Sequence, residues 1–259
     1  MSEPHVLVRR EGALGRVTLN RPERLNALTD DMRARIADGF AEFQQDEAVR
    51  AVTLDAAGTG FCASGDTSTM GRFTAVSARD RLRSAHRMII AIATIEKPVI
   101  AAVRGPVAGI GWSMALACDM IVASETAVFS QVFRNVGLVP DGGAIYFLTQ
   151  ALGVLRAKEL VYTGRRMPAP EAAALGLVTR LVPDNQLDAE ARTLAEQMAD
   201  GPTFALGVAK KMFKSVNTPS LETYLDTESW AQGIALMTED HGEGIDAFKA
   251  KRPPVFRAR

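Results

Sequence analysis

Apolar residues recur along the chain with two alternating spacings. Short runs with β-branched members are typical of buried strands, whereas apolar residues three and four positions apart are typical of one face of a helix. Strands are predicted at residues 6–8, 17–19, 52–54, 98–103, 120–123 and 177–182. Helices are predicted at residues 31–45, 79–95, 110–117 and 141–152, and from residue 187 onward with breaks at Gly201-Pro202 and near Asn217-Pro219. This alternation predicts an α/β fold.

The same pattern divides the chain into two regions. We expect an α/β core over residues 1–195 and a helical region over residues 196–259. No low-complexity linker separates them. A chain of 259 residues buries enough surface to fold without a disulfide or a structural metal.

Acidic and basic residues are balanced. The chain has 30 of each, which gives a formal net charge of zero. Proteins that bind nucleic acids or anionic membrane surfaces usually have an excess of basic residues, so we expect neither as a partner. The longest apolar-leaning run without charge, between Arg104 and Asp119, is too short to span a membrane, and the first residues do not form a secretory signal.

Cysteine and histidine are sparse. Cys62 and Cys118 cannot form a disulfide framework, and His5, His86 and His241 are too far apart to form a metal-ligand motif. We therefore expect a protein of the reducing cytoplasm, with no metal. His86, which has apolar neighbours on its helix, is predicted to be a core histidine, and the other two are predicted to lie on the surface.

Two glycine-bearing loops at strand ends are the first candidates for chemistry. They cover residues 58–66 and 104–111, and the second runs directly into a predicted helix. Glycine allows close approach of a ligand to the backbone, and the free N–H groups at a helix start favour an anion. Two such N–H groups can form an oxyanion hole. The competing interpretation is that these glycines only form turns.

Known glycine motifs do not explain the second loop. Gly109-Ile110-Gly111 contains the first two glycines of a dinucleotide fingerprint, but Met114 stands where the third is needed, and no P-loop motif occurs. Gly111-Trp112-Ser113-Met114-Ala115 approaches a nucleophile elbow, with Asp141 and His241 following in the order of a serine hydrolase. This remains a remote alternative that uses Ser113, because loop-like residues separate the preceding strand from the turn.

Asp141 precedes an apolar helix in the sequence Pro140-Asp141-Gly142-Gly143. One interpretation is structural, because aspartate is a favoured N-cap. The other is chemical: a carboxylate that faces a pocket can serve as a general base, with its pKa raised by burial.

Five segments, in order and spacing, give the chain a resemblance to a known family. They are residues 21–28 (RPERLNAL), 61–66 (FCASGD), 97–105 (KPVIAAVRG), 115–119 (ALACD) and 243–248 (EGIDAF). On these motifs the sequence resembles the crotonase superfamily, the enoyl-CoA hydratase/isomerase family, over nearly its whole length.

The resemblance implies a fold, an assembly and a substrate class. The fold would be a spiral of ββα units in two roughly perpendicular sheets, followed by a helical C-terminal trimerisation region. The assembly would be a homotrimer or a dimer of trimers. The substrate would be an acyl-CoA thioester, with coenzyme A as part of the substrate and no permanently bound cofactor.

The resemblance also assigns residues. The N–H groups of Gly65 and Ile110 would receive the thioester oxygen and stabilise an enolate. The residues that would hold coenzyme A or the acyl group are Arg24, Leu25, Ala27, Ala63, Asp66, Phe133 and Lys251. Ser64 departs from the family, which has glycine before the oxyanion donor; if the position needs positive φ, serine costs about 1 kcal/mol and shifts the loop.

A second departure concerns the reaction. Hydratases of the family use two glutamates, and Ser113 and Phe133 stand at those positions. Asp141 instead matches the carboxylate of members that resemble phenylacetyl-CoA ring-epoxide isomerases and 3,2-enoyl-CoA isomerases. One carboxylate suffices to move a proton, so the site pattern predicts isomerisation. The alternatives are a hydratase with atypical acids, an aryl-CoA dehalogenase, whose histidine His86 matches, and a non-catalytic acyl-CoA-binding homologue.

Overall fold

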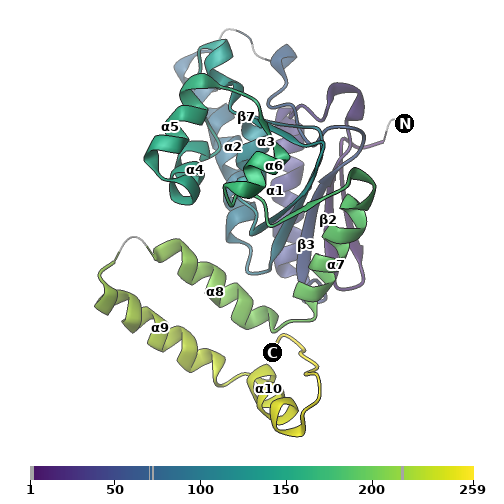
Figure 1. The fold of residues 1–259 in the computed structure, drawn as a ribbon, viewed down its shortest axis with the longest axis vertical. Helices are drawn as coiled ribbons and strands as arrows, with labels where there is room; N and C mark the ends of the chain where they lie inside the picture. Colours follow the sequence, from purple (N-terminus) through teal and green to yellow (C-terminus); the bar gives the residue numbers. More distant parts are fainter. Residues whose placement is uncertain (1–2, 70, 72, 217–218) are drawn as a thin grey trace.

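A six-stranded sheet forms the centre of the α/β body in the computed structural model, which describes residues 3–69, 71, 73–216 and 219–259 (Figure 1). The strand order is β1-β2-β3-β4-β6-β9. The strands are β1 (Val6–Glu11), β2 (Leu14–Leu19), β3 (Ala51–Ala56), β4 (Val99–Val103), β6 (Met120–Ser124) and β9 (Arg180–Val182). The first two predicted strands form an antiparallel hairpin, β1 with β2, and the other pairs in this sheet are parallel.

A second, three-stranded sheet consists of β5 (Pro106–Ala108), β7 (Val128–Ser130) and β8 (Met167–Pro168). Strand β5 directly follows β4, and β7 directly follows β6, so each consecutive pair contributes one strand to each sheet before a helix begins. These are the ββα units that the resemblance implies. The sequence pattern did not predict the three strands, because segments of two or three residues are too short to show a period.

Ten α-helices lie within the described residues. They are α1 (Asp30–Gln45), α2 (Ala75–Thr94), α3 (Ile110–Leu116), α4 (Ala144–Leu152), α5 (Val154–Thr163), α6 (Ala169–Ala174), α7 (Leu187–Ala199), α8 (Thr203–Ser215), α9 (Leu221–Ala235) and α10 (Glu239–Ala250). Short 3₁₀ turns cover Pro22–Arg24, Thr67–Thr69, Val132–Val136 and Asp184–Gln186. No helix of the described chain is long and apolar enough to cross a membrane.

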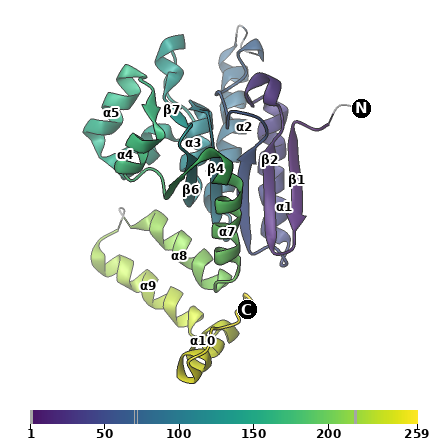
Figure 2. The same ribbon diagram turned by 45° about the vertical axis from the view of Figure 1, so that its right-hand side comes forward.

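The two faces of the large sheet have separate cores. Alternate residues of β3 and β4 point to opposite faces, as a pleated strand requires. Ala51, Ile100 and Ala102 pack with α7 on one face, while Val52 and Leu54 join the larger core on the other. Figure 2 shows α7 on the near side of the strands and α1 behind them. Because both faces are covered, β4 is apolar along its whole length, and in β3 only Thr53 and Asp55 interrupt the apolar residues.

Two helix starts differ from the sequence prediction for local reasons. Helix α2 begins at Ala75 instead of residue 79, because Thr74 and Ser77 form a reciprocal capping box. Helix α4 begins at Ala144 instead of residue 141, because Gly142 and Gly143 both have positive φ. The predicted capping role of residue 141 is therefore wrong.

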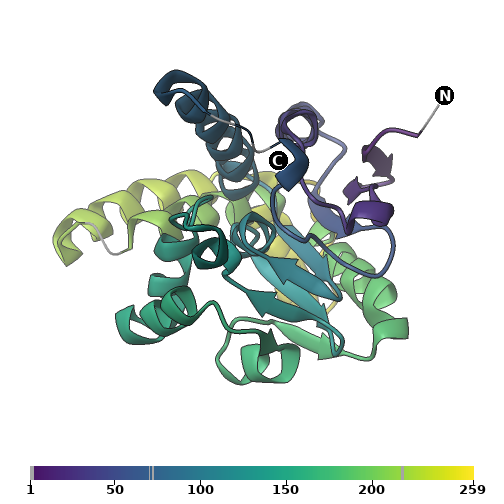
Figure 3. The ribbon, with the colours of Figure 1, turned by 90° about the horizontal axis from the view of Figure 1, so that it is seen from above.

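Helices α8, α9 and α10 form a layer below the α/β body (Figure 1), and α8 and α9 extend past it when viewed from above (Figure 3). The predicted break at Gly201-Pro202 separates α7 from α8, while the break near 217–219 falls partly outside the described residues. The boundary at residue 195 lies within α7, and a separate oligomerisation region after it stays a prediction.

Candidate active site

A buried asparagine fixes the first glycine loop. The side-chain amide of Asn26 is fully buried and donates to the carbonyls of Ala57 (2.9 Å) and Gly60 (2.8 Å). Its oxygen accepts from the Arg21 N–H at 2.8 Å. The Arg21–Leu28 motif therefore holds the loop that leads to residue 66.

The register beside Leu28 determines where the Gly65 N–H points. Leu28 donates its N–H to the Ser64 carbonyl, and its carbonyl accepts from the Asp66 N–H, each at 2.9 Å. Gly65 lies between these two bonded residues, so its own N–H points away from Leu28. No acceptor among the described residues takes this N–H.

Ile110 supplies the second free N–H. It is the first residue of α3, and the first N–H groups of a helix have no intrahelical acceptor. Gly109 makes the turn into the helix with φ of 52° and ψ of −124°, a conformation open to glycine. Its N–H donates to Ser130 of β7 at 2.9 Å, which anchors the helix start to the small sheet.

The two loops lie against each other. Cys62 donates its N–H to Pro106 (3.0 Å) and accepts from the Ala108 N–H (2.9 Å). A Cβ atom on Gly109 would lie 2.3 Å from the Ser64 Oγ, so the second loop must be bare at this point. This close approach brings both free N–H groups to the wall of one cavity.

The cavity, of about 310 Å³, brings together five of the predicted site residues: Ala63, Gly65, Ile110, Phe133 and Asp141. The remaining described lining residues are Arg33, Ser64, Thr67, Phe73, Ala78, Arg81, Leu82, Val132, Asn135, Val136 and Leu138. Apolar side chains form most of this surface, and the residues that follow the first loop contribute Thr67, Phe73, Ala78, Arg81 and Leu82.

Asp141 is the one carboxylic acid among the described residues that line this cavity. Its Oδ1 is buried and has no hydrogen-bond partner among the described residues. Burial raises the pKa of the Asp141 carboxyl, while the charges of Arg33, His86 and Arg81 lower it, and the net direction is upward. A carboxyl in this state suits the removal and return of a proton.

The serine-hydrolase alternative is not supported. Ser113 is fully buried, and its hydroxyl donates to the backbone carbonyls of Gly109 (3.3 Å) and Asp141 (2.9 Å). The histidine proposed as its base, His241, is exposed on α10 and does not line the cavity. The Ser113 hydroxyl therefore connects the start of α3 to the turn at Asp141.

Other predicted substrate residues lie outside the cavity. Arg24 and Leu25 are exposed and Ala27 is half-buried, around the 3₁₀ turn on the outer side of the first loop, and Lys251 is exposed at the end of α10. Asp66 is buried, and its carboxylate pairs with Arg21 and accepts from Ser68. Contact of these five residues with a substrate stays a prediction.

Sequence reasoning missed two cavity residues and misplaced one histidine outside the cavity. Arg33 of α1 and Arg81 of α2 both line the cavity, although charged residues on amphipathic helices are usually solvated. His86 is exposed on α2, so the prediction of a core histidine was wrong. The position of Arg33 directly after Met32, on the buried side of its helix, was the one available signal.

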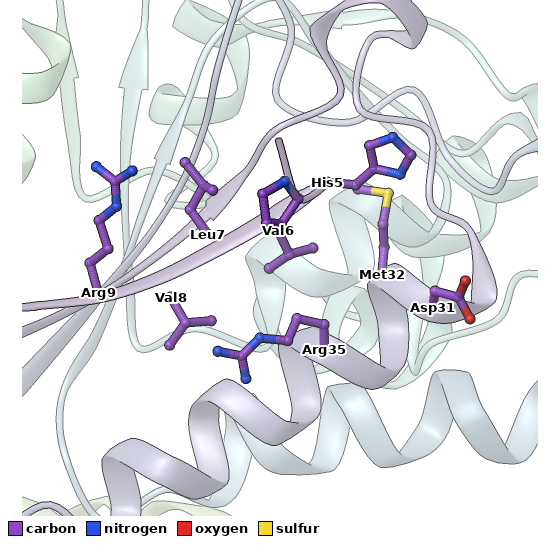
Figure 4. Close-up of a pocket in the computed structure, with 9 residues that line it drawn as sticks. His5, Val6, Leu7, Val8, Arg9, Asp31, Met32 and Arg35 are labelled. Carbon is purple, nitrogen blue, oxygen red and sulfur yellow. The ribbon is translucent and has the colours of Figure 1, made fainter. Parts of the chain in front are cut away.

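A second cavity, of about 370 Å³, lies between β1 and the start of α1 (Figure 4). His5, Asp31 and Arg35 are its polar landmarks, next to Val6 and Val8. None of the predicted site residues lines it, and neither glycine loop reaches it. Its chemistry therefore offers no alternative active site.

Known proteins match both the sequence and the fold. Residues 9–259 match the family model for enoyl-CoA hydratase/isomerase. The 1,2-epoxyphenylacetyl-CoA isomerase of Escherichia coli K12 is 37% identical over 247 residues, 94% of each chain. A "probable enoyl-CoA hydratase" of Rhodobacter capsulatus is 34% identical over 244 residues, also 94% of each chain. The structure of an enoyl-CoA hydratase from Bacillus anthracis matches with a TM-score of 0.94 at 30% identity, covering 99% of this chain and 100% of that one. The chain belongs to the enoyl-CoA hydratase/isomerase family.

Proposed function

We propose that this protein is an acyl-CoA isomerase that shifts a double bond or rearranges a ring through a thioester enolate. One observation carries the proposal. Asp141 is the single carboxylic acid among the described residues that line the cavity, and Gly65 and Ile110 line the same cavity. The proposed reaction needs one base and two hydrogen-bond donors. It uses no metal and no resident cofactor, and coenzyme A enters with the substrate.

In the proposed mechanism Asp141 removes a proton from the carbon of the acyl group next to the thioester carbonyl. The electrons of the broken C–H bond pass to the carbonyl oxygen, and the N–H groups of Gly65 and Ile110 stabilise the resulting enolate. Asp141, now protonated, returns the proton at another carbon, and the double bond moves. The raised pKa of the Asp141 carboxyl supports this cycle, because it makes the carboxylate a stronger base for the first proton transfer.

Hydration is the second candidate, because relatives named as hydratases match the chain. It requires a group that activates water and a group that protonates carbon. Ser113 is buried with its hydroxyl bonded to backbone carbonyls, and Phe133 presents an apolar ring to the cavity. These residues support isomerisation over hydration.

We propose that coenzyme A binds beside this cavity. We also propose that the protein assembles as an oligomer. Arg24, Leu25 and Ala27 surround the first loop, and Leu25 lies close enough to Gly60 that a Cβ there would be 3.3 Å from its side chain. They would hold coenzyme A together with Ala63, and Lys251 would reach its phosphates in the same or a neighbouring subunit. The exposed apolar residues of α8–α10 support assembly as a homotrimer or a dimer of trimers.

We place the proposed enzyme in the cytoplasm. Cys62 and Cys118 are free thiols, and burial raises the pKa of Cys62 to about 12. Neither cysteine is arranged for the disulfides that are typical of secreted proteins. Cell fractionation tests this location.

The isomerase proposal is tested with 3-enoyl-CoA and 2-enoyl-CoA in deuterated water. We expect the wild-type protein to convert the 3-enoyl to the conjugated 2-enoyl thioester, read by absorbance, with deuterium uptake read by mass spectrometry. Asp141→Asn removes the base and should lower the rate about 10²–10⁴-fold. Because the base form exists only above the pKa, kcat/KM should fall as pH decreases, with a midpoint above that of an ordinary carboxyl, about 4.

Asp188→Asn is the matched control, since Asp188 is exposed on α7 and pairs with Arg104. This variant should keep wild-type turnover. Full activity in Asp141→Asn would contradict the assignment of the base. Accumulation of a 3-hydroxyacyl-CoA would establish hydration instead.

A further inference from the structure

Ser64 is a strained residue in the wall of the proposed acyl cavity. It is half-buried and has φ of 94°, a backbone conformation that favours glycine. Positive φ costs a residue with a side chain on the order of 1–3 kcal/mol, and such strain is concentrated at functional sites. The mechanism proposed above does not use the serine side chain, so its presence at this position asks for a separate explanation.

The Ser64 hydroxyl lies where the two glycine loops meet. Its Oγ is 2.3 Å from the point that a Cβ on Gly109 would occupy, which places it within about 4 Å of the Gly109 Cα. Ser64 directly precedes Gly65, and Gly109 directly precedes Ile110. The hydroxyl therefore belongs to the residue before one proposed oxyanion donor and lies against the residue before the other.

No group of the described chain forms a hydrogen bond with this hydroxyl. The nearest backbone N–H on the second loop, that of Gly109, donates to the Ser130 carbonyl instead. The Ser64 Oγ is also not one of the polar atoms that are enclosed without a partner, so it keeps accessible surface. Because Ser64 lines the cavity, a bound acyl group can reach the hydroxyl.

A hydroxyl at this point suits the charge that the proposed reaction develops. The thioester oxygen becomes negative in the enolate, and a hydrogen bond to it strengthens as that charge grows. Serine can donate one O–H, and it adds no charge of its own to the cavity. The hydroxyl rotates about its Cα–Cβ bond, whereas a backbone N–H is fixed, so its contribution should be smaller than that of either N–H group.

We propose that the Ser64 hydroxyl is a third oxyanion donor, which binds the thioester oxygen of the substrate together with the N–H groups of Gly65 and Ile110. This inference rests on the proposed function, because it takes the cavity as the acyl site. Ser64 is thereby a catalytic residue, and the strained backbone is the cost of presenting its hydroxyl between the two loops.

The test removes the hydroxyl in two ways that have opposite effects on the backbone. Ser64→Ala keeps a side chain at positive φ, and Ser64→Gly relieves the strain and is the variant that should fold in any case. Both should lower kcat for 3-hexenoyl-CoA about tenfold, the effect of one hydrogen bond to a charged acceptor. The dissociation constant of saturated hexanoyl-CoA should change less than about twofold, because its carbonyl oxygen carries only a partial charge.

Infrared spectroscopy of bound hexanoyl-CoA, labelled with ¹³C at the thioester carbonyl, detects the contact directly. A hydrogen bond to the oxygen lowers the carbonyl stretching frequency, so the band should move to higher frequency in both variants. Ser84→Ala is the matched control, since Ser84 lies on α2 and is not among the described residues that line the cavity. It should keep the wild-type kcat and the wild-type band.

Wild-type kcat in either Ser64 variant would overturn the inference, because the loss must follow the hydroxyl and not the backbone. An increase in KM with unchanged kcat would also overturn it, since the hydroxyl would then bind the ground state only. An unshifted carbonyl band in both variants would show that the hydroxyl does not touch the thioester oxygen. If the wild-type protein turned over no thioester at all, the proposed function itself would fail, and the two failures are therefore distinguishable.

Discussion

The α/β body and the C-terminal layer bury their apolar residues in different ways. The body has two continuous cores that cover both faces of its large sheet. Helix α9 has no buried residue, and Trp230 of α9 is 77% exposed while Phe248 of α10 is 83% exposed. The body thus encloses cores of its own, although it also has exposed apolar residues such as Leu155, whereas α9 has none that is buried; such uncovered apolar residues are typical of an interface.

This difference separates chemistry from assembly. Every described residue that lines the proposed active cavity precedes residue 142, and none belongs to α8–α10. A change in the body should therefore alter catalysis without altering the oligomer, and a change in the layer should do the reverse. Three substitutions test that separation, in order of decreasing effect.

Gly109→Ala should have the largest effect, and it should be on catalysis. The new Cβ would lie 2.3 Å from the Ser64 Oγ at a residue with φ of 52°, so the helix start that presents the Ile110 N–H must move. Losing one oxyanion donor costs about 10²–10³ in kcat. We expect a loss of about 100-fold in isomerisation, measured at saturating 3-enoyl-CoA.

Gly153→Ala controls for backbone strain alone. Gly153 has φ of 77° and ψ of 165°, and a Cβ there would meet no atom within 4 Å. Both variants should lose stability to a similar extent, on the order of 1–3 kcal/mol in denaturant unfolding. Equal loss of kcat in the two variants would show that the effect is general destabilisation and not displacement of the donor.

The sequence predicted the large sheet and most of the helices because their apolar runs are long enough to show a period, but it did not predict α5 and α6. It missed β5, β7 and β8, of three, three and two residues, which pairing between distant segments defines. It predicted Gly65, Ile110 and Asp141 as site residues through glycine chemistry and family resemblance, and the three line one cavity. It missed Arg33, because a charged residue in the first turns of a helix is normally solvated, and only the tertiary packing of α1 against α2 encloses it.

Trp230→Asp should have the next largest effect, and it should be on assembly. A buried interface tryptophan contributes about 2 kcal/mol or more, which is roughly 30-fold in an association constant. Light scattering should show a shift toward smaller species at low concentration. Leu155→Asp on α5 is the control, because Leu155 is 83% exposed but belongs to the body, and it should leave the oligomer intact. Equal dissociation in both variants would remove the distinction between body and layer.

Ser64→Gly should have the smallest effect, on stability. Ser64 has φ of 94°, which confirms that this loop position needs the positive φ expected from the family glycine. Backbone strain at this serine destabilises the fold by on the order of 1–3 kcal/mol, which glycine removes. Glycine loses more conformational entropy on folding, which offsets about 0.5–1 kcal/mol of that stabilisation. We expect a net rise of about 1 kcal/mol in the free energy of unfolding, measured with urea.

Ser64→Ala separates strain from the contact that the hydroxyl makes with Gly109. It keeps a side chain at positive φ and removes only the Oγ, so it should not gain the stability that glycine gains. If alanine and glycine stabilise the protein equally, the penalty lies in the hydroxyl and not in the backbone. If neither substitution stabilises the protein, the packing between the two loops fully compensates the strain at residue 64. Contacts with neighbouring residues, and not the φ of this one residue, would then determine the stability of the loop.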